Sequence, residues 1–127
     1  MIIQLETIAA IATPIGEGGI SIIRLSGSNA ITLAEKCFFG KKISEQQTHT
    51  AHFGKIRNSN GVIIDEVVLT LFKSPRSYTG EDTVEISCHG GVLVTQAVLE
   101  TILKTGARSA EPGEFTYRAF LNGKLEL

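Results

Sequence analysis

Arg24 occupies a strand-like segment of the sequence, where the backbone would hold a ligand-binding side chain rigidly. It follows Ile20 and Ile22 at alternate positions, so one face of the segment changes from apolar to cationic near its end. An unpaired buried guanidinium is costly, so Arg24 needs a carboxylate, a ligand or an exit to solvent. Spacing alone favours the last of these, an arginine whose head group extends into water.

Glu85 lies in another strand-like segment, between Thr83 and Ser87 on the polar side of the alternation. Such a side is commonly the solvated face of a half-exposed strand, and the pattern by itself favours that interpretation. The functional alternative is a carboxylate on a rigid strand that accepts two N–H hydrogen bonds from a planar heterocycle.

Residues 16–19 are rich in glycine and invite a phosphate-binding interpretation, which the pattern does not support. A P-loop requires GxxxxGK followed by Ser or Thr, and a dinucleotide fingerprint requires GxGxxG between a strand and a helix. Here the glycines precede a strand. A tight turn, or a close approach of the backbone to a flat ligand, fits better.

The triplet His89-Gly90-Gly91 suggests a catalytic histidine at first sight. No motif places a nucleophile for it, and such a lone histidine is more often structural. Cys37 and Cys88 belong to apolar faces, so we predict free core thiols in a reducing compartment. Neither cysteine matches a metal-ligand spacing, and we therefore predict no catalytic residue and no metal ligand.

The last segment pairs Glu114 with Arg118, and Arg118 with Asn122, each four residues apart. This is the spacing of neighbours on a helix, and we interpret both as ordinary surface pairs. Lys124, just after Gly123, has two possible roles. It can hydrogen-bond the last carbonyls of the helix or reach an anionic ligand, and spacing does not choose between them.

The elements that must position these residues follow no regular strand–helix–strand rhythm. The pattern predicts strands at 7–13, 20–25, 50–57, 61–73, 83–88 and 107–110, and helices at 29–39, 92–105 and 113–121. Asn-Gly within 58–61 favours a hairpin turn. Apolar residues of both parities in 20–25 indicate burial on both faces of that strand. The whole predicts an α+β fold, a mixed sheet with packed helices.

The composition is that of one globular domain. The 127 residues are 43% hydrophobic and 20% charged, enough for a single modest core. Lys plus Arg number 12 and Asp plus Glu 13, and a net charge of -1 lacks the basic excess of a dedicated nucleic-acid binder. No segment resembles a secretory signal or a bilayer-spanning run, so we expect no membrane partner and a cytoplasmic location. The apolar end suggests that the chain continues in a longer protein.

Several blocks of sequence together carry a family resemblance. They are TIAAIATP at 7–14, GGISIIRLSG at 18–27, SYTGED at 77–82 with Glu85 and HGG after it, PGEFT at 112–116, RAFLN at 118–122 and GKL at 123–125. In this order, over nearly the whole chain, they closely resemble the N-terminal domain of the MnmE (TrmE) family of tRNA-modifying GTPases.

The resemblance implies a fold similar to tetrahydrofolate-binding domains such as that of the glycine-cleavage aminomethyltransferase. It also implies a homodimer through this domain and the binding of 5-formyltetrahydrofolate or a related reduced folate. The family's folate-contacting positions fall on Arg24, Glu85 and Lys124. The resemblance therefore favours a ligand-binding role for all three over a solvent-exposed or helix-capping one. Glu85 suits the 2-amino and N3–H edge of a pterin. Arg24 and Lys124 suit the carboxylates of the glutamate tail or a pterin carbonyl.

The resemblance further implies that residues 1–120 form the folate-binding and dimerisation domain and that 121–127 begin a linker into helical and GTPase domains. The parent proteins hydrolyse GTP, with Mg²⁺ and K⁺, in that later domain. With the FAD-dependent partner MnmG (GidA), they add a carboxymethylaminomethyl or aminomethyl group to the wobble uridine of tRNA, and the folate is the expected one-carbon donor. This chain has no P-loop motif, so we expect no GTP hydrolysis by it.

Two other functions stay open at this point. One is a free-standing aminomethyltransferase-like folate enzyme, and the other is a dimerisation or RNA-docking module without a ligand. The near-neutral charge and the 6% aromatic content disfavour RNA docking. A dry ion pair between Arg24 and Glu85, with no room between them, would support a role in dimerisation alone.

Overall fold

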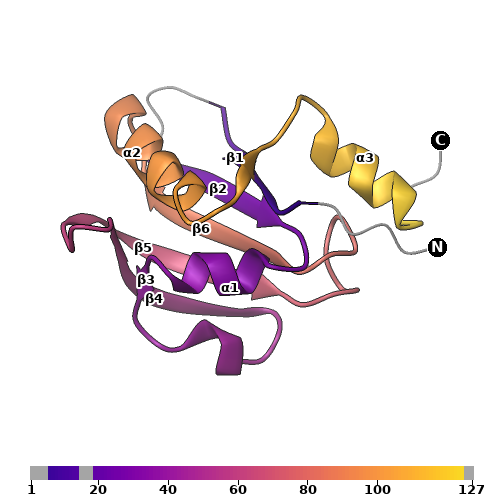
Figure 1. Cartoon of the computed structure of the whole chain (residues 1–127), viewed down its shortest axis with the longest axis horizontal. Helices are drawn as coiled ribbons and strands as arrows, with labels where there is room; N and C mark the ends of the chain where they lie inside the picture. Colours follow the sequence, from indigo (N-terminus) through magenta and orange to yellow (C-terminus); the bar gives the residue numbers. More distant parts are fainter. Residues whose placement is uncertain (1–5, 15–18, 125–127) are drawn as a thin grey trace.

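The computed structural model describes residues 6–14 and 19–124, which form one curled sheet with helices packed on it (Figure 1). In this part of the chain the strands are β1 (Ile8–Ile11), β2 (Ile20–Ser26), β3 (Phe38–Phe39), β4 (Thr50–Arg57), β5 (Ile63–Phe72), β6 (Thr83–His89) and β7 (Arg108–Ser109). The helices are α1 (Ala30–Glu35), α2 (Val92–Leu103) and α3 (Glu114–Leu121), with a 3-10 turn, η1 (Ile43–Glu45).

The strand order in the sheet is β3-β4-β5-β6-β2-β1-β7. Every neighbouring pair is antiparallel except β1 and β7, which run parallel. The predicted α+β class and mixed sheet are therefore confirmed. The short strand predicted at 107–110 is confirmed as β7, which pairs with β1 and forms one edge of the sheet.

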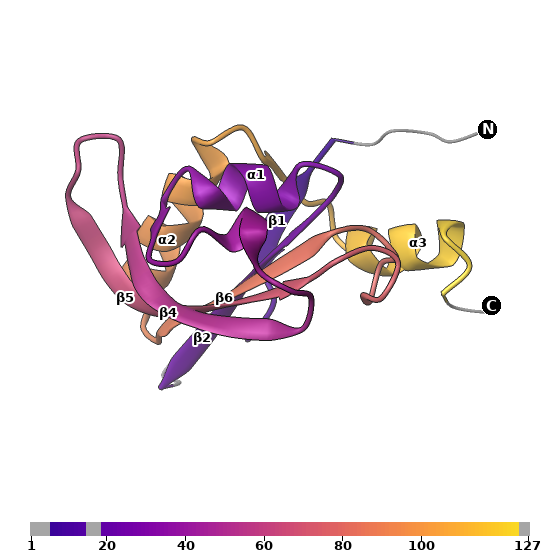
Figure 2. The ribbon, with the colours of Figure 1, turned by 90° about the horizontal axis from the view of Figure 1, so that it is seen from below.

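Helices α1 and α2 cover only one face of the sheet, as the view in Figure 2 shows. The core lies between them, with Ile23 of β2, Ile86 of β6 and Ile102 of α2 fully buried. The opposite face is open, and Ile20 is 66% exposed on it. The prediction that the second strand is buried on both faces is thus wrong, because a sheet strand is buried twice only where a second layer covers it.

The predicted helix at 29–39 ends early, at Glu35, and Phe38–Phe39 form β3 instead. Phe38 is buried, and its ring packs against Gly54 of the adjacent β4 so closely that a Cβ there would lie 2.5 Å from it. As part of β3, Phe38 pairs with β4 and its ring can pack against Gly54. Tertiary packing therefore overrides the helical spacing of the apolar residues in this segment.

The predicted hairpin is confirmed, because β4 and β5 pair in antiparallel register. Asn58 holds the turn: its Oδ1 accepts hydrogen bonds from the N–H groups of Asn60, at 2.9 Å, and Val62, at 3.0 Å.

Pro112 lies before α3 and not in its first turn, since Gly113 precedes the helix in the left-handed conformation with φ 76°.

Helix α3 stands beyond the end of the sheet instead of lying on it (Figure 1). Arg118 anchors the helix with a fully buried side chain. Its Nη2 donates to the carbonyl of Glu6 at 2.6 Å, and its Nη1 donates to Glu81 Oε1 at 3.2 Å. The predicted pair with Glu114 exists, at 3.2 Å, but its assignment to the surface is wrong. Arg118 reaches inward because this helix has no broad apolar face on the sheet, and charged partners fill that role.

Candidate functional site

Arg24 and Glu85 lie opposite each other on the open face of the sheet. They are cross-strand partners on β2 and β6, and Arg24 Nε donates to Glu85 Oε2 at 2.9 Å. Each side chain keeps 25% of its surface exposed. The structure thus brings together two residues that are 61 positions apart in the chain, as an ion pair that water still reaches.

Arg24 also lines a cavity of about 410 Å³, here called the Arg24 cavity. The cavity is lined by Ala10, Ile11, Ala12, Arg24, Tyr78, Ala110, Glu111, Pro112, Gly113, Phe115 and Thr116. It therefore lies between the end of β1 and the start of α3. Its volume falls in the range of small-molecule sites, and its wall combines aromatic rings with one cationic group.

Two aromatic rings flank the guanidinium at the cavity wall. Arg24 Cζ lies 5.5 Å from the ring centroid of Tyr78 and 5.5 Å from that of Phe115. At this distance the cation is attracted to the faces of both rings. The hydroxyls of Tyr78 and Thr116 hydrogen-bond at 2.9 Å, which joins the loop at 74–82 to α3 across the cavity.

Lys124 does not contact the ion pair. Its Nζ donates to the carbonyl of Pro75 at 3.0 Å, so its side chain lies on the loop at 74–82 that also carries Tyr78. Asn122 reaches the same loop, where its side chain donates to the carbonyl of Thr79 at 2.8 Å. The predicted surface pair of Asn122 with Arg118 is consequently wrong at the side-chain level, since only the backbone N–H of Asn122 bonds the carbonyl of Arg118.

Side-chain hydrogen bonds from Ser26 of β2 hold the loop at 74–82 in place. The hydroxyls of Ser26 and Thr79, both fully buried, hydrogen-bond at 2.6 Å, and Ser26 Oγ donates to Glu81 Oε1 at 2.8 Å. Gly80 allows the close approach of the α3 end, because a Cβ at this position would lie 2.9 Å from Asn122. The wall that carries Tyr78 is therefore rigidly placed relative to Arg24.

A second charged cluster holds the opposite wall of the cavity. Arg108 Nη2 donates to Glu114 Oε2 at 2.7 Å, and the N–H of Glu111 donates to Glu114 Oε1 at 2.9 Å. The hydrogen bond from Arg108 is the main cause that lowers the pKa of Glu114 to about 2. Glu114 is therefore ionised at neutral pH and fixes the start of α3 next to Phe115.

His89 has a partner that sequence analysis did not find. Its ring Nδ1 lies 2.7 Å from Asp65 Oδ1, and its N–H donates to Asp65 Oδ2 at 2.8 Å. The two residues are 24 positions apart and share no motif, so no sequence signal links them. The ring lines a hollow of about 320 Å³ on the open face, with Ile20, Phe53 and Val68 as its apolar walls.

Both cysteines are free and buried, as predicted. Burial raises the pKa of Cys37 to about 11 and also raises the pKa of Cys88, so both are neutral thiols at neutral pH.

Within residues 6–14 and 19–124, no group of three or more His, Cys, Asp and Glu residues is arranged to hold a metal ion. In the same ranges no helix combines the length and apolar character needed to cross a membrane.

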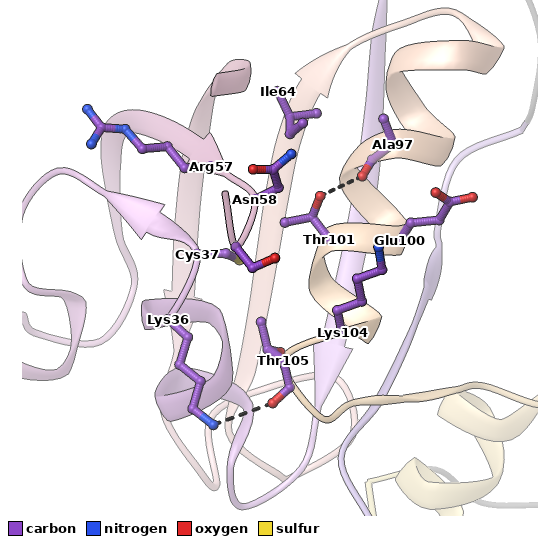
Figure 3. A pocket seen from close by; sticks show the side chains of 11 residues that line it. Lys36, Cys37, Arg57, Asn58, Ile64, Ala97, Glu100, Thr101, Lys104 and Thr105 are labelled. Carbon is purple, nitrogen blue, oxygen red and sulfur yellow. Dashed lines mark hydrogen bonds between the residues drawn. The ribbon is translucent and has the colours of Figure 1, made fainter. Parts of the chain in front are cut away.

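A further cavity, of about 360 Å³, lies between α1, α2 and the hairpin turn (Figure 3). Lys36 and Lys104 at its rim are the C-caps of α1 and α2, where a cation offsets the negative end of the helix dipole. Arg57 points away from the other labelled side chains and stacks on Phe39, with Cζ 4.5 Å from the ring centroid. None of the three predicted site residues lines this cavity. Of the glycine-rich segment at 16–19, only Gly19 is within the described residues.

Residues 7–124 match the family described as "GTP-binding protein TrmE N-terminus". The chain belongs to the MnmE (TrmE) family. It is 55% identical over 124 residues to the tRNA modification GTPase MnmE of Acholeplasma laidlawii, which covers 98% of this chain and 28% of that protein. It is 56% identical over 122 residues to the same enzyme of Protochlamydia amoebophila, covering 96% of this chain and 26% of the relative.

The MnmE of Lactobacillus acidophilus is 52% identical over 125 residues, again with 98% of this chain and 27% of the relative covered. The chain thus spans about a quarter of the length of the curated relatives it matches. Together with the family match, this identifies the chain as the N-terminal domain of MnmE.

Proposed function

We propose that this MnmE domain binds a reduced folate of the 5-formyltetrahydrofolate type through Arg24, Glu85 and Lys124. The observation that carries the proposal is the Arg24–Glu85 ion pair, which is partly exposed and has Arg24 on the wall of the Arg24 cavity. A reduced folate offers N–H donors at one end and carboxylates at the other. One anionic and two cationic side chains match these groups in kind and charge.

The ion pair suggests how the ligand would enter. Without a ligand, Arg24 and Glu85 satisfy each other, which avoids an unpaired charge on the half-buried sheet face. A pterin edge would give Glu85 two N–H donors, and this releases the guanidinium of Arg24 to face an oxygen of the ligand. Lys124 needs only to leave the carbonyl of Pro75 to meet a carboxylate of the tail.

We assign the activity of the parent protein as follows. Residues 1–120 form the folate and dimerisation domain, similar to aminomethyltransferase-like folate domains, and 121–127 begin the linker. GTP hydrolysis with Mg²⁺ and K⁺ takes place in a later domain. With the FAD-dependent MnmG, the cytoplasmic complex modifies the wobble uridine of tRNA and draws its one-carbon unit from the folate. The relatives' name, tRNA modification GTPase MnmE, supports the tRNA-modification and GTPase parts of this proposal.

We further propose that the open sheet face pairs with a second copy of the domain. Exposed apolar side chains gather there, with Ile20 66%, Phe53 65% and Val68 40% exposed around one hollow. The cross-strand partners Lys55 and Glu66 lie on the same face and bring both signs of charge. A two-fold axis repeats each patch on both copies, so opposite charges can meet across it.

Two alternatives are less well supported. A ligand-free dimerisation module would fit a dry ion pair, but each member of the Arg24–Glu85 pair keeps 25% of its surface exposed, and Arg24 borders open space. A free-standing aminomethyltransferase-like enzyme does not fit relatives that are about four times longer than this chain.

Calorimetric titration of 5-formyltetrahydrofolate into the purified chain tests the proposal. We expect saturable binding with about one ligand per chain, weakened about tenfold or more by Glu85→Gln or Arg24→Ala, which corresponds to about 1.4 kcal/mol. Lys124→Ala is expected to weaken binding less, because its side chain is exposed. Matched controls are Glu100→Gln and Lys104→Ala, exposed residues on α2 outside the proposed site.

Each result has a definite meaning. Weakening by the site variants alone supports both the ligand and the residues. Binding that survives Glu85→Gln and Arg24→Ala would contradict the site. No binding at ligand concentrations near the millimolar range, about −4 kcal/mol, would contradict folate binding by this domain as it stands.

A further inference from the structure

The charges of the chain are unevenly distributed along its sequence. Five of the 12 Lys and Arg residues lie within 36–57, where Glu45 is the only acid. This segment contains β3 and β4, and β3 forms the edge of the sheet opposite β7. On the neighbouring β5, Glu66 lies opposite Lys55 and balances its charge. A net charge of -1 disfavours a dedicated nucleic-acid binder, but a basic sheet edge within such a chain can still make a local contact with a polyanion.

Phe39 and Arg57 form a stack at this edge. Phe39 of β3 is the cross-strand partner of Lys55, and Arg57 follows two positions later on β4, so its side chain lies on the same face. Arg57 Cζ lies 4.5 Å from the ring centroid of Phe39, which is 46% exposed. The guanidinium points away from the side chains that line the cavity between α1, α2 and the hairpin turn (Figure 3). The stack therefore lies on the surface, at the end of the sheet.

The guanidinium of Arg57 has no acceptor in the part of the chain that the structure describes. Its Nε is buried without a hydrogen-bond partner, and none of the ion pairs among residues 6–14 and 19–124 includes Arg57. Stacking on a ring face uses none of the in-plane N–H groups of a guanidinium. Arg57 is only half-buried, so its outer N–H groups are left for a ligand. Two such groups match two oxygens of a phosphate.

Two lysines extend the positive charge next to the stack. Lys41 and Lys42 are exposed and follow closely after Phe39 in the chain. Lys42 Nζ lies 3.9 Å from Glu45 Oε1, but the two side chains are 63% and 68% exposed. Such an exposed pair contributes little, so a phosphate can replace the carboxylate. The edge thus combines an aromatic ring, a stacked arginine and two lysines.

We propose that this edge, defined by Phe39, Lys41, Lys42 and Arg57 and here called the basic edge, binds a single-stranded segment of RNA. A nucleobase joins the stack of Phe39 and Arg57, and the adjacent phosphates contact the guanidinium and the two ammonium groups. Aromatic surface interleaved with cations suits single strands, because each nucleotide brings a flat base and a charged phosphate. The choice of RNA among polyanions rests on the proposed role of the parent protein in tRNA modification.

Other polyanions fit the basic edge less well. An acidic protein segment would satisfy the lysines but offers no flat group to the stack. Double-stranded RNA keeps its bases stacked on one another, so only its phosphates could reach the edge. The basic edge is also separate from the other proposed sites, because none of its four residues lines the Arg24 cavity or the hollow around Phe53.

Fluorescence anisotropy of a labelled RNA hairpin with an unpaired loop, titrated with the purified chain at several salt concentrations, tests the proposal. We expect saturable binding, and a plot of log affinity against log salt with a slope of about −2, since each of about three phosphate contacts contributes about −0.7. Phe39→Leu should weaken binding about tenfold and leave this slope unchanged, because it removes stacking and no charge. Lys41→Gln should weaken binding about threefold and reduce the slope by about 0.7.

Arg57→Gln should weaken RNA binding about tenfold and also reduce the salt slope, because the arginine takes part in both the stack and the phosphate contact. The matched controls are Arg76→Gln and Tyr117→Leu, an exposed arginine in the loop at 74–82 and an exposed aromatic residue on α3. Neither control should change the affinity or the slope. A fully paired RNA of the same length should bind at least about tenfold more weakly than the hairpin.

Ultraviolet cross-linking of the same hairpin, with thiouridine in its loop, gives a decision on the unchanged chain even where a variant fails to fold. Cross-links within residues 36–57 support the proposal, and cross-links confined to other segments overturn it. Absence of saturable RNA binding, or equal affinity for polyglutamate or for fully paired RNA, would also overturn it. These measurements contain no folate, so their failure leaves the folate titration untouched. Failure of the folate titration likewise leaves the RNA contact standing.

Discussion

At the scale of single residues, Arg118 shows how one side chain can replace an apolar contact. Helix α3 meets the rest of the domain through this guanidinium, which is fully buried. It donates to the carbonyls of Glu6 and Ser26 and to the carboxylates of Glu81 and Glu114. One residue thus ties α3 to three other segments of the chain, at Glu6, Ser26 and Glu81.

Replacement of Arg118 by leucine is expected to lower the free energy of unfolding by roughly 3–5 kcal/mol, because it leaves the largely buried Glu81 without its cation and two carbonyls without donors. Urea unfolding followed by circular dichroism measures this. Lys104→Leu, at an exposed helix end, is the comparison and should change stability by less than about 0.5 kcal/mol. Equal effects of the two changes would contradict the anchoring role of Arg118.

Glu114 gives the domain a defined acid sensitivity. Its pKa falls from 4.5 to about 2 in the folded chain, chiefly through the hydrogen bond from Arg108. Because the folded pKa is the lower one, the ionised carboxylate contributes stability above about pH 4.5 and loses it as the pH falls toward 2. The difference in unfolding free energy between the chain and Glu114→Gln should therefore be constant near neutrality and shrink below that pH. A difference independent of pH down to the acid transition would count against this ion pair.

At the scale of elements, the junction between β2 and α1 depends on a glycine. Gly27 has φ 148°, and a Cβ there would lie 2.6 Å from Thr7 Oγ1 and 2.7 Å from its Cα. The N–H of Gly27 also donates to the carbonyl of Asp82 at 3.0 Å, which ties the end of the site loop to β2. The geometry of this junction therefore determines where Arg24 and the loop meet.

Gly27→Ala is expected to cost about 2 kcal/mol or more, since it combines backbone strain with a clash against main-chain atoms. Gly61→Ala is the matched control: Gly61 also has a positive φ, of 80°, but a Cβ would meet nothing within 4 Å. It should cost only the strain of its conformation, about 1–2 kcal/mol. Denaturant midpoints of the two variants compare the costs, and a smaller effect at Gly27 would refute the proposed clash.

At the scale of the whole molecule, the curled sheet separates two tasks. Helices α1 and α2 cover one face (Figure 2) and provide the core. The open face carries the Arg24–Glu85 pair and the apolar hollow around Phe53. The proposed ligand site and the proposed pairing surface therefore share one face of one sheet. Closure of that face by a second copy would also change how much solvent reaches the ion pair.

Phe53→Lys is expected to weaken self-association of the domain at least tenfold, because it places a charge in the centre of the proposed apolar contact. Sedimentation velocity over a range of concentrations measures the dissociation constant. Leu93→Lys is the control, since Leu93 is 86% exposed on α2 and lies on the other side of the sheet. A dimer that tolerates Phe53→Lys but not Leu93→Lys would place the pairing surface on the helical side.

The sequence by itself determined those features that depend on near neighbours in the chain. Alternation placed Glu85 on the polar side of its strand and Arg24 on the same side of its strand as Ile20 and Ile22. The Asn60-Gly61 pair indicated the hairpin turn. These predictions succeed because strand alternation and tight turns follow from local backbone geometry. The family blocks also assign the folate positions to Arg24, Glu85 and Lys124, and that assignment stays a prediction until the titration is done.

Only the tertiary structure decided which faces are covered and which distant groups meet. The open face of β2, the switch of Phe38 from helix to strand, the burial of Arg118 and the partner of His89 all depend on segments tens of residues away. The same holds for the Arg24–Glu85 pair and for the aromatic walls around it. The physical reason is that a side chain's burial and partners result from long-range packing, which the local period of a strand or helix does not encode.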